Sequence, residues 1–205
     1  MGEFLNLDDY MFEGVGEYRI PKILPVTEAY IKDWIQFNYV PTTRNHREVT
    51  GVQFFLFDKH FERLCNFPKR YAQTLKDFGA VLSPDFSLYF DFPKAVQIFN
   101  HYRKHWCGAV WQRYGVTVIP TRRWGLKNSY EWCFDGEPEG SIVAVSNVGV
   151  MNNKETRALF MDGYNEMLTR LQPKEVLFFG HIFDDYKGPV HYIKYQQEKG
   201  SQVEE

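Results

Sequence analysis

The chain has 205 residues, enough for one domain that buries a sizeable core without needing a disulfide or a metal. Hydrophobic residues make up 44% and charged residues 24%, which is typical of globular proteins and excludes disorder throughout. Lysine and arginine total 24 against 26 aspartates and glutamates, giving a net charge of −2. This balance excludes nucleic-acid binding driven by bulk charge and leaves only a local basic patch.

The cysteines and the N-terminal residues bear on where the protein acts. Cys65, Cys107 and Cys133 form no CxxC pair, so reduced thiols are expected and a secreted disulfide framework is not. The acidic start MGEFLNLDDY lacks the basic and apolar regions of a signal peptide. No run approaches the ~18 apolar residues that span a bilayer. We therefore expect a cytoplasmic protein with no membrane partner.

Short apolar runs alternate with helical patterns along the chain, beginning with a helix over residues 27–37. In chain order the later residues predict a strand over 52–57, a short helix over 58–64, a helix over 69–78, a strand over 80–83, a helix from 93 to 115, strands over 116–120, 130–134 and 141–146, a helix over 154–171 and a strand over 175–179. Asn152 and Glu155 resemble a capping box for the helix over 154–171.

The main strands are apolar on both faces and are separated by helices, which is typical of parallel βαβ units. We predict an α/β fold with a mainly parallel sheet of about five strands and flanking helices. Both an open sheet and a partial barrel fit this pattern. Residues 1–50 are expected to form an N-terminal flank packed on the main domain, residues 51–198 the α/β domain, and residues 199–205 a flexible tail.

Ligands of parallel α/β folds bind where the strands end. The predicted strands end at polar or ionisable residues, with Trp124 among them: Asp58, Ser83, Asp85, Arg122, Trp124, Asn147 and His181. A mixture of aspartate, arginine and histidine suits a phosphorylated ligand. The alternative is that these residues form ordinary solvated loops.

Each candidate residue has an expected role. Asp85 is the main acid/base or metal-binding candidate, with Asp58 and Asp135 as supporting carboxylates. Arg122 would pair with phosphate. Trp124 would stack on a base, and His181 would orient the ligand or transfer a proton. Ser83 and Asn147 would complete the ligand-binding edge. Two carboxylates could hold Mg²⁺ beside phosphate, although no motif demands a metal.

Several of these residue types have simpler explanations. Asp85 and Asp135 are also typical turn residues. His101 and His105 lie one helical turn apart and could share zinc, but the glutamate of HExxH is absent, so a solvated basic helix face is favoured. The 18 Phe, 13 Tyr and 5 Trp residues either fill the core or stack on ligands.

Five blocks carry a resemblance to a known family: the run GVQFFLFDKHFERLCNFP, the run LSPDFSLYFDFPKAVQIFNHYRKHWCGAVWQRYG, VIPTRRW, WCFDG and the FFG end. The chain resembles an uncharacterised family carried by bacteriophages, plasmids and conjugative elements, over roughly residues 50–180. Recurring family positions fall on Asp58, Glu62, Pro84, Asp85, Ser87, Trp111, Gln112, Pro120, Trp124, Phe134 and Gly136. The resemblance implies a mobile-element context, and hence a host cytoplasm, but no activity.

The functional hypothesis is a phage or mobile-element protein that binds a nucleotide, nucleic acid or other phosphorylated ligand at the strand ends, with hydrolysis left open. One rival is a non-enzymatic phage effector that binds and inhibits a host protein. The other is a protein that sequesters a nucleotide signal without cleaving it.

Overall fold

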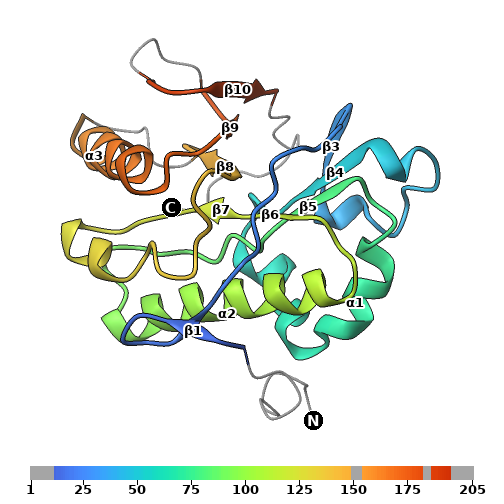
Figure 1. The fold of residues 1–205 in the computed structure, drawn as a ribbon, viewed down its shortest axis with the longest axis horizontal. Coiled ribbons are helices and arrows are strands. Elements are labelled where there is room, and N and C mark those ends of the chain that lie inside the picture. The colour runs from blue at the N-terminus through green and yellow to red at the C-terminus, as the bar shows by residue number, and fades with distance from the viewer. Residues whose placement is uncertain (1–11, 149–153, 182–185, 195–205) are drawn as a thin grey trace.

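The computed structural model describes residues 12–148, 154–181 and 186–194. It confirms the α/β class, with parallel pairing throughout two four-stranded sheets (Figure 1). The first sheet consists of β3 (Asp33–Gln36), β4 (Thr50–Gln53), β5 (Ala80–Leu82) and β6 (Val118–Ile119). The second consists of β7 (Thr121–Arg122), β8 (Ile142–Ser146), β9 (Glu175–Phe179) and β10 (Val190–Ile193). A separate antiparallel pair is formed by β1 (Gly14–Val15) and β2 (Ile20–Pro21).

Pro120 divides one extended segment into β6 and β7. Proline has no N–H to donate to a ladder, but its carbonyl accepts from Ala144 N at 2.9 Å. On the other side, the Ile119 carbonyl accepts from Ser83 N at 2.9 Å. The segment therefore joins the two sheets, because its first half pairs with β5 and its second half with β8.

The joined sheets curl so that distant strands meet. Trp34 of β3 makes an edge contact with Phe179 of β9, with 5.4 Å between ring centroids. Phe55, just after β4, lies 4.9 Å from the same ring. These contacts favour the partial barrel over the open sheet, since β3 and β9 belong to different sheets.

Side chains of β8 and β9 alternate between two cores, as the pleat requires. One face joins the core of the first sheet. The opposite face packs against α3 (Lys154–Leu171), and we call the cluster between this face and α3 the second core. The inward residues are Ile142, Ala144, Leu177 and Phe179, and the outward residues are Val143, Val145, Val176 and Phe178. Both faces are therefore buried, which explains the continuous apolar runs in the sequence.

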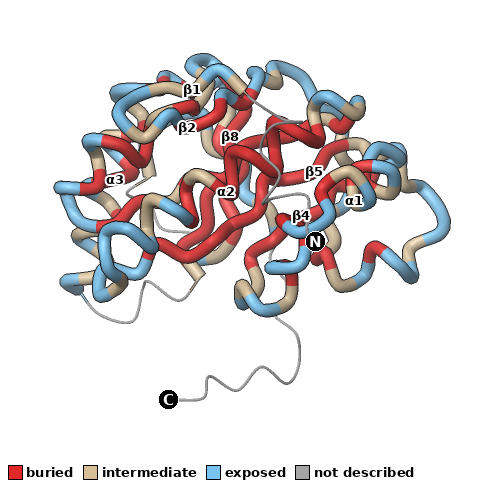
Figure 2. Tube along the Cα trace, turned by 90° about the horizontal axis from the view of Figure 1, so that it is seen from below, coloured by how far each residue is buried: buried red, intermediate tan, exposed pale blue. Residues whose placement is uncertain are grey.

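The helices cover the outside of the strands. Helix α1 (Pro68–Leu75) begins with proline at its first position, where the missing N–H is harmless. Helix α2 (Lys94–Arg113) runs below β6 and β7, and its second half is buried (Figures 1 and 2). Short 3₁₀ helices are η3 (Phe37–Tyr39), η4 (Arg47–Val49), η5 (Asp58–His60), η6 (Glu62–Asn66) and η7 (Lys127–Glu131).

Three local predictions were wrong. Residues 33–36 form strand β3 and not a helix, because pairing with β4 outweighs their helical pattern. The strand predicted over 130–134 is instead the end of η7 and a turn that buries Trp132. The strand predicted over 52–57 ends at Gln53, whose side-chain oxygen accepts from Phe55 N at 2.6 Å. The capping residue Asn152 and the tail over 199–205 lie outside the described residues.

Candidate functional site

Two carboxylates and one guanidinium converge at the carboxyl edge of the sheet. Asp58 follows β4, Asp85 follows β5 and Arg123 follows β7. Arg123 forms an ion pair with Asp85 through two nitrogens: Nη2 donates to Oδ2 at 2.6 Å and Nε donates to the same oxygen at 3.1 Å. The Asp85 side chain is 3% exposed and that of Arg123 is 25% exposed. We call Asp58, Asp85, Ser87 and Arg123 the rim cluster.

Asp58 is held in the rim cluster by Ser87. Its two carboxylate oxygens accept from Ser87 N at 3.1 Å and from Ser87 Oγ at 2.9 Å. Burial raises the pKa of Asp58 and the Asp85 charge adds to this, while the Ser87 hydrogen bonds oppose it. Burial acts to lower the pKa of Arg123, but the charges of Asp85, Tyr89 and Asp58 raise it above its ordinary value. The cluster is thus electrostatically coupled.

Helix α2 supports the loop that carries Asp85 and Ser87. Asn100 Nδ2 donates to the Ser87 carbonyl at 2.7 Å. The Arg103 guanidinium lies 3.7 Å from the centre of the Phe86 ring and also pairs with Glu62 at 3.1 Å. These contacts preorganise the rim cluster, since they fix the loop from a rigid element.

Arg122 does not belong to the rim cluster. Successive side chains of an extended segment point to opposite sides, and Arg122 pairs with Glu137 inside the protein. The same carboxylate lies 2.7 Å from Lys104 Nζ and 3.0 Å from His105 Nε2. None of these four side chains is more than 4% exposed. We call Lys104, His105, Arg122 and Glu137 the interior cluster.

Burial dominates the electrostatics of the interior cluster. It lowers the pKa of Lys104 to about 7, with the Arg122 charge adding to the effect and Asp85 opposing it. It also lowers the pKa of Arg122 to about 9. The Glu137 carboxylate acts against both shifts because it contacts both cations. Burial lowers the pKa of His105 well below its usual value, and the charges of Lys104 and Arg122 add to this.

Three further predicted ligand-binding residues are engaged in packing or internal hydrogen bonds. Trp124 lies in the second core, 5.2 Å from the Phe160 ring, and is 8% exposed. Ser83 Oγ and Thr121 Oγ1 are 3.0 Å apart and buried. Asn147 is buried and accepts from His181 N at 2.9 Å, which ties the end of β8 to the end of β9.

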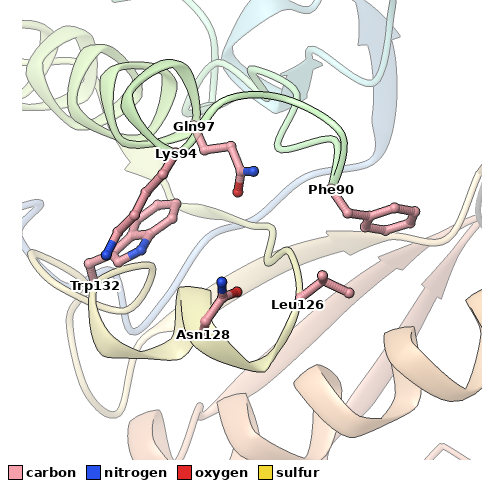
Figure 3. Close-up of a pocket in the computed structure, with 6 residues that line it drawn as sticks. All are labelled: Phe90, Lys94, Gln97, Leu126, Asn128 and Trp132. Atoms are coloured by element: carbon pink, nitrogen blue, oxygen red, sulfur yellow. The ribbon is translucent and has the colours of Figure 1, made fainter.

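Asp135 lies in a different environment from Asp58 and Asp85. Together with Glu137 and Arg170 it lines an open cleft of about 620 Å³ next to the N-terminal residues 22–25. Burial raises its pKa and Arg170 opposes this. The three aspartates therefore do not form a single carboxylate site. A smaller pocket of about 50 Å³ is lined by Phe90, Lys94, Gln97, Leu126, Asn128 and Trp132 (Figure 3).

Sequence reasoning missed most of the interior cluster. Lys104 and His105 resemble a solvated helix face, and Glu137 lies in the unremarkable segment GEPEG. The burial of both α2 side chains corrects the expectation of a solvated face. The sequence motif TRRW does indicate an arginine at this strand end. The choice between Arg122 and Arg123 depends on which side of the strand each side chain faces.

Within residues 12–148, 154–181 and 186–194, none of the helices has both the length and the hydrophobicity to cross a bilayer.

The fold and the rim cluster define an α/β protein with curled parallel sheets and a polar candidate site at their carboxyl edge. The chain belongs to the family described as a domain of unknown function, DUF4417, which matches residues 12–196. This confirms the resemblance noted from the sequence blocks.

Two curated relatives are phage proteins. The chain is 39% identical to the Gene 1 protein of Mycobacterium phage L5 over 175 residues, which cover 83% of this chain and 75% of the relative. It is also 39% identical to the Gene 1 protein of Mycobacterium phage D29 over 173 residues, which cover 83% of this chain and 63% of that relative. No solved structure matches the chain.

Proposed function

We propose that this phage-related protein binds a phosphorylated ligand, a nucleotide or a nucleic acid, at the rim cluster. The observation that supports this proposal is the convergence of Asp58, Asp85 and Arg123 from three strands at the carboxyl edge of parallel sheets. This edge is where α/β folds bind ligands.

Arg123 takes the phosphate-binding role in this proposal, because Arg122 is enclosed with Glu137. Arg123 uses Nε and Nη2 on Asp85, and among the described residues its Nη1 has no acceptor. A phosphate oxygen could take that free donor as a charge-assisted hydrogen bond. Asp85 would then hold the guanidinium in place instead of acting as a base.

Exposed rings near the rim cluster are suited to a base. Tyr89 is 48% exposed and lies four residues after Asp85 in the loop that also carries Ser87 of the rim cluster. Phe57 is 54% exposed and immediately precedes Asp58. Aromatic stacking on a base is worth ~1–3 kcal/mol and tolerates any sequence.

Hydrolysis is the finer form of the proposal. Asp58 is its acid/base candidate, because burial raises the pKa of this carboxyl group. Asp58 and Asp85 together offer the oxygen donors that Mg²⁺ uses beside phosphate. His181, exposed after β9, remains a proposed proton donor. Binding without turnover would instead make the protein a sequestering protein for a nucleotide signal.

The first experiment is mass spectrometry of small molecules and nucleic acid that copurify with the protein. Nucleoside triphosphates and a single-stranded oligonucleotide are then titrated against wild type and Arg123→Ala. Losing a charge-assisted bond of ~1.5–3 kcal/mol should weaken binding about 10- to 100-fold. Arg113→Ala removes an exposed arginine from the end of α2 and is the matched control. Equal affinity for wild type and a well-folded Arg123→Ala would count against the proposal.

The second candidate function is that of a non-enzymatic effector that docks on a host protein. The specific observation is the set of large exposed hydrophobic side chains from the loop after β5, from α2 and from the segment after β7: Tyr89, Phe90, Phe99 and Leu126. Phe90 and Leu126 lie on the same pocket (Figure 3), as aromatic anchors of interfaces often do. Phe90→Ser should then abolish stoichiometric capture of one host protein while leaving nucleotide binding unchanged.

A further inference from the structure

Two histidines of α2 converge with Glu137 in the protein interior. His101 and His105 lie one helical turn apart, and their ring centroids are 4.4 Å apart. The two residues are 1% and 0% exposed. One ligand atom from each histidine and one carboxylate oxygen of Glu137 all lie within 4.8 Å of one another. The rings are therefore part of a compact internal cluster and not of a solvated face.

Hydrogen bonds to backbone carbonyls determine which nitrogen of each ring carries the hydrogen. His101 Nε2 lies 3.1 Å from the Asp135 carbonyl, and His105 Nδ1 lies 2.9 Å from the Pro21 carbonyl. A carbonyl oxygen only accepts, so both of these nitrogens are donors. In the neutral rings, the lone pairs then sit on His101 Nδ1 and His105 Nε2.

These two lone pairs have no hydrogen donor. Among the described residues, neither His101 Nδ1 nor His105 Nε2 has a hydrogen-bond partner, although both atoms are buried. His105 Nε2 instead faces a Glu137 oxygen at 3.0 Å. The nitrogen lone pair and the carboxylate oxygen repel each other unless a proton or a cation lies between them. Metal-binding histidines show the same pattern, with the remote N–H donated to a backbone carbonyl.

We propose that His101 Nδ1, His105 Nε2 and the Glu137 carboxylate bind a transition-metal ion, for which Zn²⁺ is the best fit. Two imidazoles and one carboxylate form a familiar zinc donor set, in which water takes the fourth position. Ligand atoms around tetrahedral zinc are ~3.4 Å apart, given bonds of about 2.0–2.1 Å. The Nε2–oxygen separation of 3.0 Å already approaches that spacing. Glu137 also lines the open cleft although its side chain is 0% exposed, so the proposed site adjoins that cleft.

The two neighbouring cations limit what can bind. Lys104 and Arg122 contact the same carboxylate and repel a divalent ion, so the nitrogen donors must supply most of the affinity. Mg²⁺ prefers oxygen donors and keeps its water, which excludes it here. Zn²⁺ and Co²⁺ accept imidazole well. This inference is independent of the phosphorylated ligand proposed for the rim cluster.

The test is titration of chelator-treated full-length protein with Co²⁺ alone and Zn²⁺ alone. We expect one equivalent of Co²⁺ to produce the visible absorption of a four-coordinate ion, and Zn²⁺ to displace it. His101→Gln keeps a donor for the Asp135 carbonyl but changes the ligand, so affinity should fall at least about tenfold. His191→Gln alters an exposed histidine that pairs with Glu175 and should leave binding unchanged.

Two outcomes would overturn the inference. A Co²⁺ spectrum of the hydrated ion in wild type would do so without any variant, even if His101→Gln fails to fold. Equal Co²⁺ affinity in wild type and folded His101→Gln would also do so, since the ion would then lie elsewhere. Loss of binding in His191→Gln alone would assign the ion to the surface and reject the interior site.

Discussion

Replacing Glu137 by glutamine should destabilise the protein through the charges it leaves behind. The substitution keeps the size of the side chain but removes the negative charge that contacts Lys104 and Arg122. Both cations are at most 4% exposed at their side chains, so water cannot replace the carboxylate. Breaking a buried pair in this way typically costs ~3–5 kcal/mol. That is a large part of the ~5–15 kcal/mol by which a domain is stable.

The pH dependence should identify Lys104 as the group responsible. Burial lowers the pKa of Lys104 to about 7, and the variant lacks the carboxylate 2.7 Å away that opposes this shift. The unfolded lysine has a pKa of ~10.4, so between these two values the unfolded state of wild type and variant alike binds more protons, and the stability of both rises with pH by up to about 1.4 kcal/mol per unit. Without the carboxylate, the pKa of Lys104 lies below its wild-type value, so below about pH 7 only the variant keeps losing stability as the pH falls. The stability deficit of the variant relative to wild type should therefore grow as the pH falls below about 7.

Urea unfolding followed by tryptophan fluorescence at pH 7 and pH 5.5 measures both effects. Glu139→Gln removes an exposed carboxylate two residues away and should change the free energy of unfolding by less than about 0.5 kcal/mol. A Glu137→Gln protein within about 1 kcal/mol of wild type at pH 7 would refute the buried ion pair. A deficit that stays the same at pH 5.5 would refute the role of Lys104.

Three further predictions concern the second core and the thiols. Trp124→Ala should lower the free energy of unfolding by ~3–5 kcal/mol, because the ring is buried against Phe160. If the variant unfolds at the same urea concentration as wild type, the buried placement of Trp124 is wrong. Gly163→Ala would bring a Cβ to within 2.2 Å of Trp124. The resulting overpacking should destabilise the protein by ~1–3 kcal/mol, more than alanine stabilises the helix, so the melting temperature should fall. Burial raises the pKa of Cys133 to about 12 and that of Cys107 well above its usual value, so iodoacetamide at pH 8 should label neither until urea is added. Rapid labelling of the native protein, read by mass spectrometry, would show that these thiols are accessible.

Local pattern determined most of the strand and helix positions. β5, β8 and β9 are short apolar runs because both faces of their sheets are covered. The helix predicted over 154–171 matches α3, since its buried residues recur at helical spacing. We expected the polar groups that follow the strands to lie together, because parallel strands end at the same edge. Asp58 and Asp85 do lie close enough for their charges to interact.

Tertiary contacts decided the rest. Residues 33–36 became a strand because β4 offered a partner, which no local pattern encodes. Arg122 and Arg123 are adjacent in sequence, yet one pairs with Glu137 and the other with Asp85, because the pleat sends them to opposite sides. His101 and His105 look like a polar helix face, but the carbonyls of Asp135 and Pro21 cover it. Glu137 acquires its importance only from the partners gathered around it, which lie 15 or more positions earlier in the chain. Sequence patterns report neighbours along the chain, whereas the charge state and accessibility of a site depend on neighbours in space.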